Sequence, residues 1–185
     1  MEALLISTSV VALAEIGDKT QLLALILAAR FKKPLPIIFG ILLATIINHG
    51  IVGVFGALLT KFISPEIMRI ILGVLFIAMA IWTLIPDKIE EEETKIASHF
   101  GVFGATFITF FLAEIGDKTQ ISTIALAAHY SSIIYVVIGT TLGMLIADIP
   151  AVFIGNKFAD KLPMRLIHII AALIFAIFGV VTLLN

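Results

Sequence analysis

The fold of this chain is decided by a stretch that occurs twice: Leu13-Ala-Glu-Ile-Gly-Asp-Lys-Thr-Gln-Leu22 and, 99 residues later, Leu112-Ala-Glu-Ile-Gly-Asp-Lys-Thr-Gln-Ile121. The two copies differ only in their last residue, and each places a glutamate, an aspartate and a lysine inside a long apolar run. Moving an unpaired charge into hydrocarbon costs at least ~3 kcal/mol, so charges at such a depth mark a function. A duplicated cluster of this kind indicates ion transport.

The composition around the two copies is that of an integral membrane protein. Of the 185 residues, 61% are hydrophobic and 14% are charged, against roughly 45–50% apolar and about 25% charged residues in soluble domains. The formal net charge of −1 provides no basic surface, so we expect no nucleic-acid partner. Because the sequence has no cysteine, disulfides and thiolate metal sites are excluded.

Six apolar runs each approach the ~20 residues that a helix needs to cross a lipid bilayer. They cover residues 3–29, 35–59, 66–85, 100–128, 132–155 and 163–184. The two halves also align outside the motif: at an offset of 99 residues, Gly40 matches Gly139 and His49 matches Asp148. The pattern predicts an all-α membrane protein with a three-helix repeat over residues 1–85, an acidic linker over 86–99 and a second three-helix repeat over 100–185.

Three is an odd number of spans, so the second repeat must enter the membrane from the opposite side. The predicted architecture is therefore six transmembrane helices in two inverted repeats. Basic residues of short loops collect on the cytoplasmic side of membrane proteins. Only Lys61 and Arg69 fall on one predicted face, and eight basic residues fall on the other: Arg30, Lys32, Lys33, Lys88, Lys95, Lys157, Lys161 and Arg165. We expect the linker to be cytoplasmic and both termini to lie outside.

The spacing of the motif, taken as a helix, places its charges on one face. Asp18 and Lys19 follow Glu15 by three and four residues, which are same-face positions. The second copy repeats the pattern with Glu114, Asp117 and Lys118. Inverted symmetry would bring the four carboxylates together near the midplane as one metal site, partly balanced by the two lysines. The alternative is a salt-bridge cluster that only holds the helices together.

The donor atoms of the motif favour a hard divalent cation. Carboxylate, hydroxyl and amide oxygens suit Mg²⁺, Ca²⁺ and Mn²⁺, and the motif has no histidine, cysteine or methionine to favour Zn²⁺, Cu⁺ or Ni²⁺. Neutral oxygens are available from Thr20, Gln21, Thr119 and Gln120. Crowded carboxylates also hold protons readily, so exchange of protons for metal is a natural mechanism. We expect the metal to be the transported ion, with no resident cofactor.

Four further positions have two interpretations each. Gly17 and Gly116, between the acids, either loosen the helix or let another helix pack closely. Asp148 lies inside a predicted span, where an acid indicates a function; it would neutralise a motif lysine or relay protons, with structural pairing as the alternative. For His49 we expect a hydrogen-bonded packing role, with a role in the site as the alternative.

Two Glu-x-Gly-Asp-Lys-Thr motifs, one in the first span of each half, resemble the Golgi-type calcium/manganese cation–proton antiporter family. The resemblance covers essentially the whole chain, including the acidic central loop. It implies transport of Mn²⁺, and also of Ca²⁺, out of the cytosol in exchange for protons, with Glu15, Asp18, Glu114 and Asp117 as the metal site. The compact chain looks like a prokaryotic member, which implies the plasma membrane.

Other function classes stay open at the level of sequence. A passive divalent-cation channel is the main alternative, followed by a membrane-embedded enzyme or a structural subunit. We expect no enzyme, because Gly-x-Ser-x-Gly, His-Glu-x-x-His and P-loop motifs do not occur. Small residues such as Gly40, Gly53 and Gly56 allow close helix packing within the chain or in a homodimer.

Overall fold

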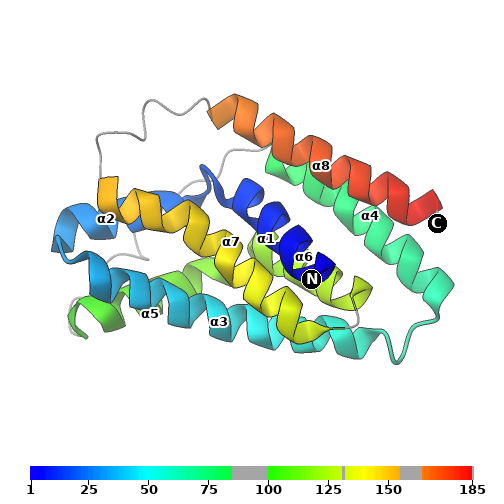
Figure 1. Ribbon diagram of the computed structural model, residues 1–185, viewed down its shortest axis with the longest axis horizontal. Helices are drawn as coiled ribbons and strands as arrows, with labels where there is room; N and C mark the ends of the chain where they lie inside the picture. The colour runs from blue at the N-terminus through cyan, green and yellow to red at the C-terminus, as the bar shows by residue number, and fades with distance from the viewer. Residues whose placement is uncertain (85–99, 131, 155–163, 185) are drawn as a thin grey trace.

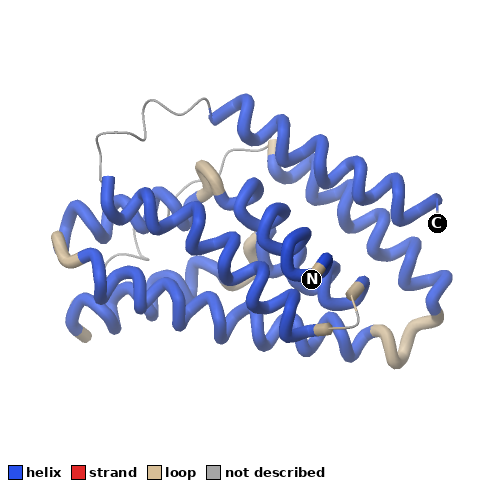
Figure 2. The backbone as a smooth tube through the Cα atoms, in the orientation of Figure 1, coloured by secondary structure: helices blue, strands red, loops and turns tan. Residues whose placement is uncertain are grey.

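The computed structural model describes residues 1–84, 100–130, 132–154 and 164–184, and these residues form helices without any strand (Figures 1 and 2). The predicted all-α class is confirmed. Two of the described helices are long and apolar enough to cross a membrane, over Pro34–Leu59 and Ile133–Phe153. The predicted linker 86–99 and the basic residues Lys157 and Lys161 lie outside the described part of the chain.

The described helices follow the same order in both halves of the chain. The first half contains α1 (Glu2–Glu15), α2 (Lys19–Phe31), α3 (Pro34–Leu59) and α4 (Pro65–Thr83). The second half contains α5 (Gly101–Glu114), α6 (Lys118–His129), α7 (Ile133–Ile154) and α8 (Met164–Leu184). Each half thus has two short helices followed by two longer ones, as a duplication predicts.

The prediction of one continuous helix through each motif is wrong. The first predicted span of each half consists of two helices, α1 with α2 and α5 with α6, and the break falls inside the motif. Gly17 and Gly116 adopt φ values of 84° and 79°, which side chains of L-residues rarely allow and glycine adopts freely. Asp18 and Asp117 then cap the helices that follow. Of the two interpretations of these glycines, loosening of the helix is confirmed.

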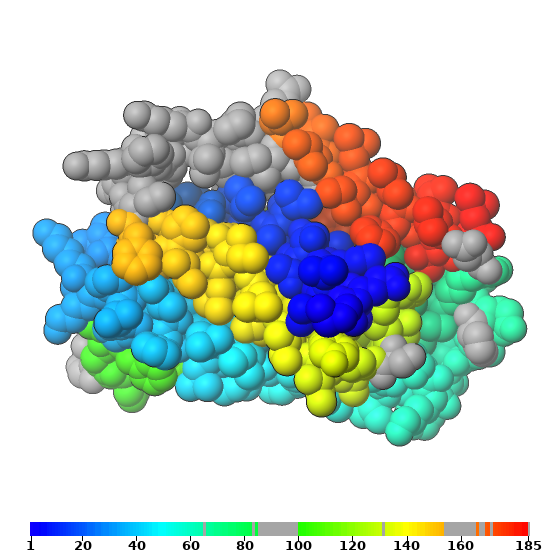
Figure 3. Space-filling view, viewed as in Figure 1, coloured from blue at the N-terminus to red at the C-terminus, as the bar shows by residue number. Residues whose placement is uncertain are grey.

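Each motif-bearing short helix packs on the long helix of the opposite half. α1 packs along α7 and α5 packs along α3, and the first pair lies side by side on the face shown in Figure 3. Glycines make the approach close: a Cβ atom at Gly139 would lie 2.6 Å from the Leu4 carbonyl oxygen, and one at Gly40 would lie 2.7 Å from the Thr106 Cβ. This packing places α1, which ends at Glu15, on α7 and places α5, which ends at Glu114, on α3.

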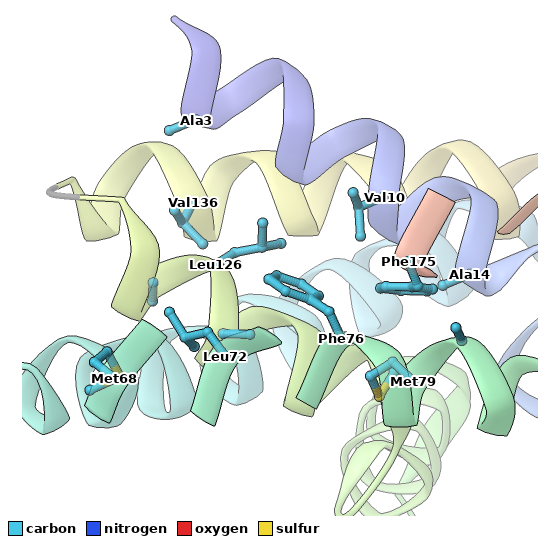
Figure 4. Close-up of a cluster of buried hydrophobic side chains, with 13 residues drawn as sticks. Ala3, Val10, Ala14, Met68, Leu72, Phe76, Met79, Leu126, Val136 and Phe175 are labelled. Atoms are coloured by element: carbon cyan, nitrogen blue, oxygen red, sulfur yellow. The ribbon is translucent and has the colours of Figure 1, made fainter. Parts of the chain in front are cut away.

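Two apolar clusters enclose the broken motifs. The first joins α4 and α8 to α1 and α6, and its centre is Phe76 stacked on Phe175 with ring centroids 6.4 Å apart (Figure 4). The second joins α2, α3, α5 and α7. Ala14 belongs to the first cluster and Ala113 to the second. Each motif glutamate therefore follows directly on a residue that is anchored in an apolar core.

Several helix ends gather around one cavity of about 520 Å³. Its lining includes residues from the starts of α1 and α4 and from the ends of α6 and α8. Examples are Glu2, Met68, His129 and Val181. These four helix ends therefore lie near one another.

Candidate metal centre

Each break is held by side chains of the helix that follows it. The Oδ1 atom of Asp18 accepts a hydrogen bond from the Lys19 backbone N–H at 2.7 Å. The side-chain oxygen of Gln21 accepts one from the Gly17 backbone N–H at 2.8 Å. The second copy repeats this, because the Gln120 oxygen accepts from the Gly116 N–H at 3.0 Å. The glutamines thus use their oxygen atoms to stabilise the breaks.

The breaks bring buried carboxylates from both halves together. Glu15 and Glu114 have no exposed surface, and Asp18 and Asp117 are almost completely buried. Glu15, Glu114 and Asp117 each offer one oxygen atom such that all three atoms lie within 4.8 Å of one another. A single ion can therefore contact all three, because trans ligands of one ion with bonds of ~2.4 Å lie about 4.8 Å apart.

The lysine of each motif pairs with the aspartate of the other motif. The Lys118 Nζ atom lies 3.0 Å from Asp18 Oδ2, and Lys19 Nζ lies 3.7 Å from Asp117 Oδ1. The Lys118 side chain is 1% exposed, whereas that of Lys19 is 20% exposed. The lysines therefore balance the aspartates of the cluster, and neither ion pair includes a glutamate.

Several carboxylate oxygens of the cluster have no hydrogen-bond partner among the described residues. Both side-chain oxygens of Glu15 and of Asp148, and the Oε1 atom of Glu114, are buried in this way. Asp148 comes from α7 and is close enough to repel the charges of Glu15 and Glu114. Buried acceptors without donors are costly, so this arrangement suits a bound cation or protons.

The threonines of the two copies have different surroundings. The Thr119 hydroxyl lies 3.1 Å from Glu114 Oε2 and 3.1 Å from Asp117 Oδ2, and so links the two acids of its own motif. The Thr20 hydroxyl is buried without a hydrogen-bond partner in the described part of the chain. Among the neutral oxygens that the sequence suggested, that of Thr20 is thus the one left without a partner.

Two residues of α3 contact residues of the motifs although the predicted ligand set did not include them. The His49 Nε2 atom lies 3.5 Å from Glu114 Oε2. The Asn48 side chain accepts from Gln120 Nε2 at 3.3 Å and donates to the Phe111 carbonyl oxygen at 3.1 Å. The signal was present, because His49 aligns with Asp148 at the offset of 99 residues. The equivalent positions of α3 and α7 both place an ionisable side chain beside the motif glutamates.

Comparison with known proteins places this arrangement in context. The family model described as "Divalent cation/proton antiporter GDT1" matches residues 3–91 and 102–185. A Vibrio cholerae protein provisionally named a manganese exporter is 50% identical, with 98% of this chain and 90% of that protein covered. GDT1-like proteins of Synechocystis and of Oryza sativa are each 30% identical; the alignments cover 93% and 97% of this chain, and 92% and 72% of those proteins. No solved structure matches the chain.

Proposed function

This chain belongs to the GDT1 family of divalent cation/proton antiporters, and from the geometry of its buried acids we propose that it exports Mn²⁺ from the cytosol. Ca²⁺ is a second substrate in this proposal, and protons move in the opposite direction. The proposed ligands come from both halves of the chain: Glu15, Asp18, Glu114 and Asp117.

One observation carries the proposal. Three buried carboxylates from two identical motifs present oxygens within 4.8 Å of one another. Both oxygens of Glu15 and the Oε1 atom of Glu114 lack donors among the described residues. With Asp148 the cluster has five carboxylates against two lysines. This surplus of negative charge is compensated by a divalent cation or by protons, so either ion can occupy the site.

The same competition explains the coupling between metal and protons. A metal ion and protons bind the same oxygens, so they exclude each other from the site. The empty site carries several uncompensated negative charges, which are costly at this depth. A transporter with such a site changes its access only when the site holds metal or protons, and the exchange of the two becomes obligatory.

The proposed membrane arrangement treats α1 with α2, and α5 with α6, as one broken span each. Together with α3, α4, α7 and α8 they form six spans in two inverted three-helix repeats, with the breaks near the midplane. The helix ends around the cavity at Glu2 then form the outer end, where both termini lie. The basic loops and residues 86–99 lie on the cytoplasmic side of a prokaryotic plasma membrane.

A flux experiment tests the proposed function. The full chain is reconstituted in liposomes that contain a Mn²⁺-quenched dye, and Mn²⁺ uptake is followed with and without a pH gradient. An interior more acidic than the medium should accelerate uptake, and added Mn²⁺ should drive protons outward. The Glu15→Gln and Glu114→Gln variants should each lose at least 90% of the flux, because even a changed partner of a metal ligand costs about tenfold or more. Glu66→Gln, on the exposed start of α4, serves as the control. Flux that is independent of the gradient and moves no protons would identify a channel.

A further inference from the structure

The His49 imidazole is held through one ring nitrogen and directed at the acid cluster through the other. The Nδ1 atom lies 2.9 Å from the Thr140 hydroxyl on α7, and the Nε2 atom lies 3.5 Å from Glu114 Oε2 on α5. The whole side chain is buried. Three helices therefore fix the position and the direction of this ring.

The contacts of Thr140 favour one tautomer of the His49 ring. When the Thr140 hydroxyl donates its hydrogen to the Val137 carbonyl oxygen at 3.2 Å, it accepts from His49 at 2.9 Å. The Nδ1 atom is then the N–H donor, and in the neutral ring Nε2 keeps its lone pair. This lone pair has no hydrogen-bond partner in the described residues.

Two acceptor atoms thus face each other across the edge of the cluster. Their separation of 3.5 Å exceeds the roughly 2.7–3.2 Å of N–H···O hydrogen bonds. It suits two ligands of one metal ion, which for bonds of ~2.1 Å lie about 3.0 Å apart at an angle of about 90° and about 3.4 Å apart at about 110°. A histidine that donates its other N–H to a fixed acceptor is also the usual form of a metal-ligating histidine.

From these contacts we propose that His49 is a ligand of the transported ion through Nε2, and that this nitrogen favours Mn²⁺ over Ca²⁺. The inference rests on the proposed function, because it adds a ligand to the proposed site. Ca²⁺ takes oxygen ligands, whereas first-row transition metals also bind imidazole nitrogen. The motifs alone provide only oxygens, so His49 is the group that distinguishes the two ions.

The other half of the chain offers an internal comparison. Asp148 is the counterpart of His49, and the counterpart of Thr140 at the same offset is Ile41, which has no hydroxyl. The hydroxyl that orients His49 is therefore present where the histidine needs it and absent opposite the aspartate. This matched difference indicates that the nitrogen ligand and its support form one unit.

Pulsed electron paramagnetic resonance on the purified full chain loaded with Mn²⁺ tests the ligand directly. A coordinated imidazole should produce ¹⁴N couplings in the wild-type spectrum, and they should shift to ¹⁵N couplings after histidine labelling. His49→Gln should remove the couplings and weaken Mn²⁺ binding about ten- to a hundredfold, the range found when the surroundings of a metal ligand are changed. His129→Gln, at the exposed end of α6, is the matched control and should keep both the couplings and the binding.

Two further variants separate coordination from a purely structural role. Thr140→Val keeps the histidine but removes its acceptor, so it should weaken Mn²⁺ binding by about tenfold. His49→Asp gives both halves an aspartate and should lower the ratio of Mn²⁺ to Ca²⁺ affinity by about ten- to a hundredfold. A structural role alone would weaken the binding of both ions equally.

The outcomes distinguish this inference from the proposed function. Bound Mn²⁺ that is lost in Glu15→Gln but shows no ¹⁴N coupling in the wild type would overturn the role of His49 and leave the carboxylate site intact. Wild-type protein that binds no Mn²⁺ would overturn both. An unchanged Mn²⁺ to Ca²⁺ ratio in a folded His49→Asp variant would also contradict the inference.

Discussion

The two halves of the chain repeat the same motif but surround it differently. Lys118 is buried and lies 3.0 Å from Asp18, whereas its counterpart Lys19 is 20% exposed and lies 3.7 Å from Asp117. The helices behind the motifs differ as well, because α3 provides His49 where α7 provides Asp148. Duplication thus preserved the groups at the two breaks, and the halves diverged in the groups around them.

This difference has a chemical meaning for the proposed site. Two identical motifs provide carboxylates symmetrically, which is sufficient for a hard divalent cation. A histidine on one side and an aspartate on the other give the ion unlike neighbours. We infer that the motifs provide the charge needed for binding and that α3 and α7 provide the discrimination between ions.

The largest predicted effect concerns the two lysines. Lys118→Met removes the cation beside the buried Asp18, and breaking a buried ion pair costs about 3–5 kcal/mol. Lys19→Met should cost at most about 1 kcal/mol, because Lys19 is partly exposed and such pairs contribute little. Unfolding free energies of the purified variants, measured by denaturant titration in mild detergent, check the difference.

A double variant serves as the control for this comparison. Asp18→Asn combined with Lys118→Met removes both charges and keeps a side chain that can cap α2. The double variant should recover a large part of the stability lost in Lys118→Met. Equal losses in the Lys19 and Lys118 variants would show that the halves are energetically alike in spite of their different burial.

A smaller loss of stability is predicted when the glycines that contact the short helices α1 and α5 are replaced. A Cβ at Gly139 would lie 2.6 Å from a backbone oxygen of α1, and one at Gly40 would lie 2.7 Å from the Thr106 side chain of α5. Overpacking of this kind costs about 1–3 kcal/mol. We expect Gly139→Ala to destabilise more than Gly40→Ala, because a backbone atom yields less easily than a side chain.

Gly50→Ala is the matched control for the glycine pair. It lies in α3 and has nothing within 4 Å of an added Cβ, so it should be neutral or stabilise by up to about 1 kcal/mol through helix propensity. Thermal unfolding of the three variants in detergent gives the order. A Gly139→Ala variant as stable as Gly50→Ala would contradict the close packing of α1 on α7.

The sequence predicted those features that depend on local pattern and on repetition. The positions of the apolar helices, the duplication and the motif acids follow from hydropathy and from an exact repeat. A break at each motif was one of two interpretations of Gly17 and Gly116. A glycine in an apolar run can loosen the helix or allow another helix to pack closely, and the sequence does not distinguish the two. The crossed pairing of Lys19 and Lys118 and the contact of His49 with Glu114 depend on how the halves pack together, which local sequence does not specify.

The central claim is that both halves build one shared site. The stoichiometry and location of Mn²⁺ binding test this claim most directly. Isothermal titration of Mn²⁺ into the purified wild-type chain, Glu15→Gln and Glu114→Gln gives the number of ions bound per chain and their affinity. Our account predicts one ion per chain in the wild type, and about tenfold weaker binding or worse in both variants. Two ions in the wild type, with one ion kept at full affinity in each variant, would contradict it, because each half would then hold its own site.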